Sequence, residues 1–216
     1  MNLNGKSKTM EDITGVILAG GKSLRFGKNK ALAEFKGERL IERVVKMIGS
    51  VFKKVIIISN TPGDYKYLGI PIYEDMIKGL GPLGGIYTGL GRMNSEAGFF
   101  VACDMPFLNT RLIRYLVSVR DNCDAVVPKV DWMFEALHSI YSKRCLPYMK
   151  EMIDLKELQI IKVLDKVSVR YVDETELRSF DPELRFFINI NRESELKEAE
   201  MRLEEPKNNP QSFSIV

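Results

Sequence analysis

Residues 15–30 read GVILAGGKSLRFGKNK, and this stretch decides the predicted fold. An apolar run ends in two glycines, which is the pattern of a buried parallel strand followed by a loop. Glycine lets the backbone approach a ligand closely, and Arg25 and Lys30 add positive charge to the same loop. Bare N–H groups beside cations are typical of a phosphate-binding loop, although two solvated surface cations are the alternative. We therefore expect this stretch to bind a nucleotide triphosphate.

Two common nucleotide-binding loops do not fit the spacing. Residues 21–23, GKS, resemble the end of a P-loop, but the glycine that the motif requires would stand at Val16. Residues 79–84 match G-x-G-x-x-G as a string, but Pro82 interrupts it and no clear strand–helix–strand unit surrounds it. We interpret this second loop as a turn that opens a helix, with its N–H groups near a base or ribose.

The composition is that of one domain with a hydrophobic core. The chain has 216 residues, of which 45% are hydrophobic and 28% charged, and its formal net charge is +3. No dense Lys/Arg stripe stands out, so we expect no nucleic-acid partner. Three scattered cysteines are typical of a reduced protein and disfavour a thiolate zinc site. No apolar run approaches the roughly 20 residues that span a bilayer, which favours a cytoplasmic protein without a membrane partner.

Strand and helix patterns alternate along most of the chain. Strands are expected at 13–19, 54–59, 70–73, 98–103, 124–127, 136–141, 167–172 and 185–190, and helices at 39–48, 85–93, 110–120, 143–153, 157–164 and 192–203. This order predicts an α/β fold, a three-layer α/β/α sandwich with a mostly parallel, Rossmann-like sheet. We expect one domain over 12–203, with a flexible N-terminus (1–11) and a flexible tail (204–216).

Two carboxylates follow predicted strands. Asp104 comes directly after a buried strand, where the carboxyl edge of the sheet can present it to a metal ion. Mg²⁺ favours one or two carboxylates together with substrate phosphates and water, so Asp104 is the candidate Mg²⁺ ligand. Asp75 follows another strand and is a candidate for ribose or for a place beside the metal. The alternative for both is a capping or turn-stabilising role.

Four other side chains can be assigned from local pattern. His138 is the only histidine and is expected to be a structural residue in a strand. Trp132 is expected to pack in the core, with a ring facing a flat aromatic ligand as the alternative. Asn189 and Asn191 flank Ile190 in the last predicted strand, so both amides would face one way. There they would contact substrate or metal-bound water, or simply make a polar strand end.

Taken in order, these motifs resemble the molybdenum cofactor guanylyltransferases, within the larger nucleotidyltransferase fold. The likeness runs over about 13–196 and rests on LAGGxSxRxGxxK (18–30), GPLxG (81–85), CDMPF (103–107) and NxN (189–191). The chain departs from the family at Arg192-Glu193, where Thr-Pro is usual, and at Ala136, where Pro is frequent. These departures bear on the molybdopterin side more than on the GTP side.

The resemblance implies a Mg²⁺-dependent transfer of GMP from GTP to the phosphate of molybdopterin, releasing pyrophosphate. It assigns catalysis to Arg25, Lys30 and Asp104, the metal to Asp104, and the substrate side to Asn189 and Asn191. It assigns GTP binding to Leu18, Ala19, Gly20, Gly21, Ser23, Lys30, Asn60, Asp75, Gly81, Gly85 and Asp104. Partners would be GTP, molybdopterin and proteins of cofactor biosynthesis or molybdoenzyme maturation.

Three alternatives stay open from the sequence. One is a molybdopterin cytidylyltransferase that uses CTP, although Gly20 disfavours it because those relatives tend to have alanine there. Another is a guanylyltransferase that acts on adenosylcobinamide phosphate. The third is a nucleotide-binding regulator without activity, which the intact Arg25, Lys30 and Asp104 disfavour.

Overall fold

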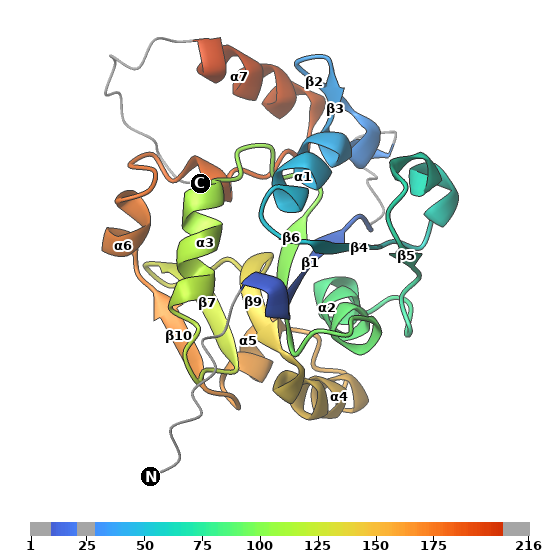
Figure 1. Ribbon diagram of the computed structural model, residues 1–216, viewed down its shortest axis with the longest axis vertical. Coiled ribbons are helices and arrows are strands. Elements are labelled where there is room, and N and C mark those ends of the chain that lie inside the picture. The colour runs from blue at the N-terminus through green and yellow to red at the C-terminus, as the bar shows by residue number, and fades with distance from the viewer. Residues whose placement is uncertain (1–9, 21–28, 205–216) are drawn as a thin grey trace.

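The computed structural model describes residues 10–20 and 29–204, and its centre is one mixed sheet (Figure 1). The strands are β1 (Ile13–Leu18), β4 (Lys54–Ile58), β5 (Ile72–Tyr73), β6 (Ala97–Ala102), β7 (Ala125–Val130), β8 (Met133–Phe134), β9 (His138–Ser142) and β10 (Val169–Val172). Their order is β10–β7–β9–β6–β1–β4–β5, with β8 paired to β7. Only β8 and β9 run antiparallel to their neighbours in this sheet, so the predicted mostly parallel sheet is confirmed.

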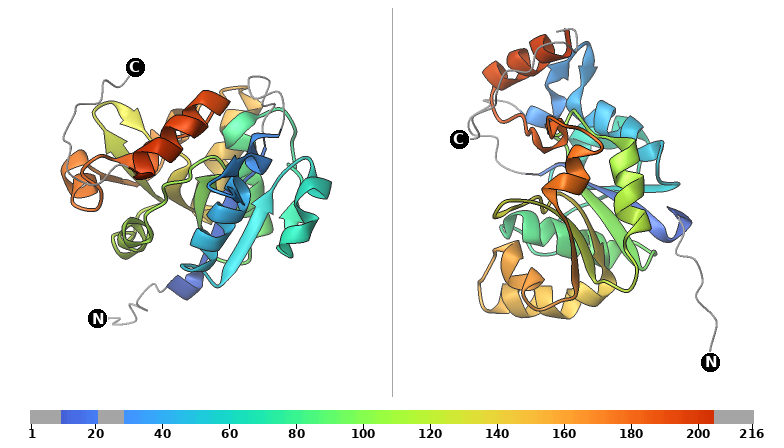
Figure 2. Two further views of the ribbon diagram at one scale, coloured as in Figure 1. Left: turned by 90° about the horizontal axis from the view of Figure 1, so that it is seen from above. Right: turned by 90° about the vertical axis from the view of Figure 1, so that its left-hand side faces the viewer.

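Helices cover both faces of the sheet (Figure 2). They are α1 (Leu40–Gly49), α2 (Gly81–Arg92), α3 (Thr110–Ser118), α4 (Leu146–Asp154), α5 (Ile160–Leu164), α6 (Glu174–Arg178) and α7 (Glu193–Glu204). Helices α1, α3 and α6 contribute to one apolar core, and α2, α4 and α5 contribute to the other. The predicted three-layer sandwich is therefore confirmed.

Strand β1 separates these two cores. All six of its residues are buried, as expected for a strand with helices on both sides. Its side chains alternate, so that Ile13 and Ile17 lie in one core and Val16 and Leu18 in the other. The apolar run at the start of residues 15–30 therefore forms a central strand, and its carboxyl end leads directly to Ala19 and Gly20.

The predicted strand at 185–190 is wrong. Residues Arg185–Phe187 form a 3-10 helix that follows Leu184, whose φ is +52°. Phe186 is fully buried in the core that contains α1 and α3, where its ring packs against His138 of β9 (ring centroids 5.5 Å apart). The Ile190 N–H donates to the carbonyl oxygen of Asp104, which follows β6 (3.0 Å). The alternation of apolar and polar residues there reflects packing of an irregular segment, which a strand pattern cannot distinguish.

The expectation that Trp132 packs in the core is also wrong, because its side chain is 80% exposed. The pair Val130–Met133 closes the β7–β8 hairpin, which leaves residues 131 and 132 as a two-residue turn. Asp131 has φ +52°, as such turns require, and the turn carries Trp132 out into solvent. His138, in contrast, is fully buried in β9, where burial lowers its pKa to about 3 and keeps the imidazole neutral.

Several short elements were not anticipated from the sequence. They are the hairpin β2 (Glu34–Phe35) and β3 (Glu38–Arg39), the 3-10 helix Pro62–Leu68 and helix α6. Residues 1–9 and 205–216, which make up most of the two predicted flexible ends, lie outside the described residues. Within the described part of the chain, no helix combines the length and the apolar character that crossing a bilayer requires.

The contact between α2 and the sheet depends on Gly89. A Cβ atom at this position would lie 2.6 Å from Phe100 Cε1 and 2.8 Å from Val16 Cγ1. We expect Gly89→Ala to lower the free energy of unfolding by about 1–3 kcal/mol through overpacking, measured by urea denaturation. Gly49→Ala is the matched control, since nothing lies within 4 Å of its Cβ position and alanine favours a helix. Equal stability of the two variants would contradict this packing argument.

Candidate active site

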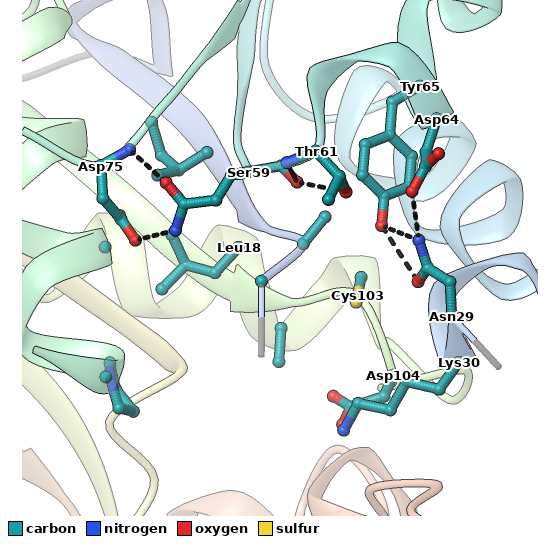
Figure 3. A pocket seen from close by; sticks show the side chains of 18 of the residues that line it. Leu18, Asn29, Lys30, Ser59, Thr61, Asp64, Tyr65, Asp75, Cys103 and Asp104 are labelled. Atoms are coloured by element: carbon teal, nitrogen blue, oxygen red, sulfur yellow. Dashed lines mark hydrogen bonds and ion pairs between the residues drawn. The ribbon is translucent and has the colours of Figure 1, made fainter. Parts of the chain in front are cut away.

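A cavity of about 990 Å³ opens at the carboxyl ends of β1, β4 and β6 (Figure 3). This volume is at the upper end of the roughly 300–1,000 Å³ usual for small-molecule sites. The described residues predicted to bind GTP all line it: Leu18, Ala19, Gly20, Lys30, Asn60, Asp75, Gly81, Gly85 and Asp104. The remaining predicted residues Gly21, Ser23 and Arg25 lie outside the described residues.

The sheet brings these segments together because its central strands end at the same level. Leu18 is in register with Ile58 on one side and with Ala102 on the other. The ladder continues to the rim of the cavity, where the Ala19 N–H donates to the Ile58 carbonyl oxygen (2.9 Å). The Cys103 N–H likewise donates to the Leu18 carbonyl oxygen (3.1 Å). Residues 19, 59 and 103 onward therefore leave the sheet side by side, as in other open α/β sheets.

Lys30, Asp104 and Asn191 meet at one end of the cavity. The Lys30 Nζ forms an ion pair with Asp104 Oδ2 and donates a hydrogen bond to Asn191 Oδ1 (3.2 Å). In the chain, Asp104 lies 74 positions from Lys30 and Asn191 lies 161 positions from it. Asp104 is only 5% exposed, so this carboxylate depends on nearby groups rather than on water for stabilisation. The cluster supplies both signs of charge that binding a phosphate and a metal ion requires.

Asp104 has the properties of a metal ligand. Its Oδ1 atom is buried and has no hydrogen-bond partner among the described residues. In residues 10–20 and 29–204 no group of three His, Cys, Asp or Glu side chains could hold a metal ion by itself. A site with a single protein carboxylate fits Mg²⁺, which takes its other ligands from phosphates and water, better than it fits Zn²⁺.

Asn60 and Asp75 form the opposite end of the cavity. Asn60 Nδ2 donates to Asp75 Oδ2 (2.7 Å), and the Asp75 N–H donates to Asn60 Oδ1 (3.2 Å). The Asn60 side-chain amide therefore uses one of its donor positions and one of its acceptor positions for hydrogen bonds with Asp75. Asp75 Oδ1 is buried and unpartnered within the described part of the chain, so it is the free acceptor at this end.

The start of helix α2 forms a wall between the two ends. Gly81 has φ +59°, and its neighbour Pro82 occupies the first turn of the helix, where a missing N–H costs nothing. A Cβ at Gly85 would lie 3.0 Å from Leu18 Cδ1, so glycine allows the helix to approach β1 closely. No side chain among residues 10–20 and 29–204 caps this helix, so within that part of the chain its first N–H groups are available to a ligand.

The two predicted substrate-side asparagines are not equivalent. Asn191 contacts Lys30, whereas Asn189 donates a long hydrogen bond to the Phe187 carbonyl oxygen (3.5 Å) and lines a separate cavity of about 230 Å³. Because residues 185–190 are not a strand, the two amides do not share a strand face. Asn189 lies close enough to Glu135 to interact with it; burial, above all, raises the pKa of that carboxyl, and the charge of Asp104 adds to the increase.

Sequence reasoning missed several residues of the cavity. Asn29, Asp64, Tyr65, Lys78, Cys103 and Leu137 line it as well. Burial raises the pKa of the Cys103 thiol to about 12, so this side chain adds a neutral wall beside Asp104. Their positions in the chain could have indicated them, since most lie within residues 15–30 or a few residues from a strand end. The β8–β9 connection that carries Leu137 had no such signal.

Comparison with known proteins agrees with this arrangement. The family described as "MobA-like NTP transferase domain" matches residues 15–169. A "Molybdenum cofactor guanylyltransferase" from Desulfosudis oleivorans is 38% identical over 193 residues, which cover 88% of this chain and 96% of that protein. The chain belongs to the MobA-like NTP transferase family. It is thus a nucleotidyltransferase by family.

Two further relatives support this membership. A "Molybdenum cofactor guanylyltransferase" from Syntrophotalea carbinolica is 33% identical over 181 residues, which cover 82% of this chain and 86% of that protein. The crystal structure of "Molybdopterin-guanine dinucleotide biosynthesis protein A" from Archaeoglobus fulgidus superposes with a TM-score of 0.77 at 27% identity. That match covers 88% of this chain and 98% of the other, so the family fold extends over nearly all of the enzyme.

Proposed function

We propose that the enzyme transfers GMP from GTP to the terminal phosphate of molybdopterin and releases pyrophosphate. An oxygen of the molybdopterin phosphate attacks the α-phosphorus of GTP, a new phosphoanhydride bond forms, and the bond to the β-phosphate breaks. The observation that carries this proposal is one cavity with a Lys30–Asp104–Asn191 cluster at one end and a free Asp75 acceptor at the other. The relatives' shared activity supports it.

The charged end suits the phosphates of GTP. Lys30 would bind the triphosphate as a point charge, and Arg25, Gly20, Gly21 and Ser23 are proposed to complete the triphosphate site. An arginine fork and backbone N–H groups bind phosphate oxygens at several points, which fixes the α-phosphate in line for attack. The role of the lysine is to stabilise the charge that grows on the leaving pyrophosphate.

Asp104 would hold Mg²⁺ through its unpartnered Oδ1 atom. When bound there, the ion would supply positive charge to phosphate oxygens, which lowers the repulsion between two anionic reactants. The ion pair with Lys30 orients the Asp104 carboxylate for this role. No general base is needed, because the attacking phosphate oxygen is already an anion, so positioning and charge carry the reaction.

The opposite end suits guanine and ribose, and Leu18, Ala19, Asn60, Asp75, Gly81 and Gly85 are proposed to bind them. A carboxylate such as Asp75 accepts hydrogen bonds from the N1–H and 2-amino groups of guanine. Adenine presents a lone pair at N1, so the same carboxylate would repel it. Discrimination by a buried polar group of this kind is strong because the wrong partner leaves it unpaired.

The acceptor would approach from the side of Asn189 and Asn191. Asn191 supports this placement, because its amide lies against Lys30 at the charged end. We also expect the product to be handed on by contact with proteins of cofactor biosynthesis or molybdoenzyme maturation.

One experiment tests the reaction and both substrates. The protein is incubated with Mg²⁺, molybdopterin and each of GTP, CTP, ATP and UTP in turn, and pyrophosphate release is followed. We expect release with GTP only, together with a guanine dinucleotide product detected by mass spectrometry. Preference for CTP, turnover only with adenosylcobinamide phosphate as acceptor, or GTP binding without turnover under all conditions would each contradict the proposal.

A further inference from the structure

Asn29 makes an unusual number of hydrogen bonds for a half-buried side chain. Its Nδ2 atom donates to Asp64 Oδ2 (2.9 Å) and lies 2.9 Å from the Tyr65 hydroxyl, which in turn donates to Asn29 Oδ1 (3.1 Å). Asn29 Oδ1 also accepts the Ala31 N–H (3.2 Å), which caps the 3-10 helix Lys30–Leu32. The residue just before Lys30 is therefore held from two directions.

The partners of Asn29 belong to the segment after β4 that also carries Asn60. Asp64 and Tyr65 lie in the 3-10 helix Pro62–Leu68, which begins two residues after Asn60. Tyr65 is 1% exposed, and burial raises its pKa to about 12, so it remains an uncharged phenol that can donate. Figure 3 shows Asn29, Asp64 and Tyr65 together at the right of the cavity, above Lys30 and Asp104 and across from Asp75.

Thus a continuous set of contacts links the segment after β4 to the backbone that carries Lys30. We propose that Asn29 is a positioning residue that holds Lys30 in place by hydrogen bonds to Asp64 and Tyr65, so that the nucleoside end and the triphosphate end of the cavity form one rigid frame. This inference rests on the proposed function, because it takes the triphosphate to be the ligand of Lys30. Asn29 itself need not touch the nucleotide.

The chemistry of the Asn29–Asp64 pair makes a sharp test possible. The amide of Asn29 must donate to the carboxylate of Asp64, so exchanging Asn29 for the isosteric aspartate places two carboxylates at hydrogen-bond distance. In Asn29→Asp/Asp64→Asn the donor and the acceptor change sides, and the hydrogen bond can form again with the same total charge. An aspartate at position 29 can still accept the Ala31 N–H, so the cap is kept.

The experiment measures dissociation constants of GTP and of GMP by calorimetry, together with thermal denaturation, for the unaltered protein and three variants. These are Asn29→Asp, Asn29→Asp/Asp64→Asn and Asn122→Asp, the last adding the same charge at an exposed residue remote from the cavity. We expect Asn29→Asp to weaken GTP binding about tenfold while GMP binding stays unchanged, because GMP lacks the phosphates that Lys30 would contact. The double variant should recover GTP affinity, and Asn122→Asp should bind as the unaltered protein does.

Three results would overturn the inference. The first is unchanged GTP binding in Asn29→Asp. The second is an equal weakening of GTP and GMP binding in Asn29→Asp, together with a melting temperature below that of Asn122→Asp, and the third is a double variant that does not recover GTP affinity. The proposed function fails separately, when the unaltered protein binds GTP but transfers no GMP to molybdopterin. The binding measurements do not depend on that transfer, so the two failures are distinguishable.

Discussion

Replacing Asp104 with asparagine is expected to reduce Mg²⁺-dependent pyrophosphate release by about 10²–10³-fold, by analogy with the loss of one charge-stabilising group in other active sites. The variant keeps the size of the side chain but removes the negative charge that pairs with Lys30 and would hold the metal ion. Its buried Oδ1 position would present either a weak amide oxygen or an N–H group to the ion, and neither replaces a carboxylate. The measurement is steady-state turnover over a range of Mg²⁺ concentrations.

The Asp104→Asn variant is expected to remain folded. Its melting temperature should stay close to that of the unaltered protein, because asparagine can still accept a hydrogen bond from Lys30 and the Lys30 side chain, 21% exposed, keeps contact with water. Asp165→Asn, at an exposed position of the α5 end, is the matched control and should turn over normally. Undiminished turnover in Asp104→Asn, or a Mg²⁺ dependence equal to that of the control, would remove Asp104 from the site.

Lys30→Met is expected to lower kcat/KM for GTP by about two orders of magnitude, which corresponds to roughly 2.7 kcal/mol of lost transition-state stabilisation. Methionine keeps much of the length of the side chain but removes the charge at the end where Asp104 and Asn191 converge. The loss should appear in both kcat and the KM for GTP, because the triphosphate is bound in the ground state and gains charge on its leaving group in the transition state.

Lys150→Met provides the comparison for the lysine. Lys150 forms an exposed ion pair with Asp154 on α4, far from the cavity, and such pairs contribute little to stability. We expect this variant to match the unaltered protein in turnover and nearly so in melting temperature. If Lys30→Met responded to GTP as Lys150→Met does, the assignment of Lys30 to the triphosphate would be wrong.

The parts of the fold that could be predicted are those with a strong local pattern. The strands at 13–18, 54–58 and 97–102 consist mostly of apolar residues, which is the usual composition of buried parallel strands. The segment at 185–190 carried an equally regular pattern but forms a 3-10 helix and an irregular stretch. There the fully buried Phe186 packs against the core, and packing outweighs β propensity.

The candidate site likewise contains residues that the sequence could predict and residues that it could not. Asp104, Asp75 and Lys30 could be proposed because each follows a strand end or a glycine loop, where open α/β sheets bind ligands. Asn29 and Asp64 could not, because nothing in either segment indicates that positions 35 apart in the chain share a hydrogen bond. Asn60 and Asp75 were both candidates, but the hydrogen bonds between them could not be predicted for the same reason.

The sequence by itself determined the order of the strands and helices that form the central sheet and its two covering layers. It also determined the two glycine loops and the position of Asp104 after β6, because each depends on short-range pattern and on backbone chemistry within a few residues. Tertiary structure decided which of those side chains meet. It paired Lys30 with Asp104 and set Asn191 but not Asn189 against them. It also left one oxygen of Asp75 and one of Asp104, at opposite ends of the cavity, without a partner among the described residues. These contacts join residues separated by up to 161 positions, and only the packing of the whole sheet and its helices fixes such distances.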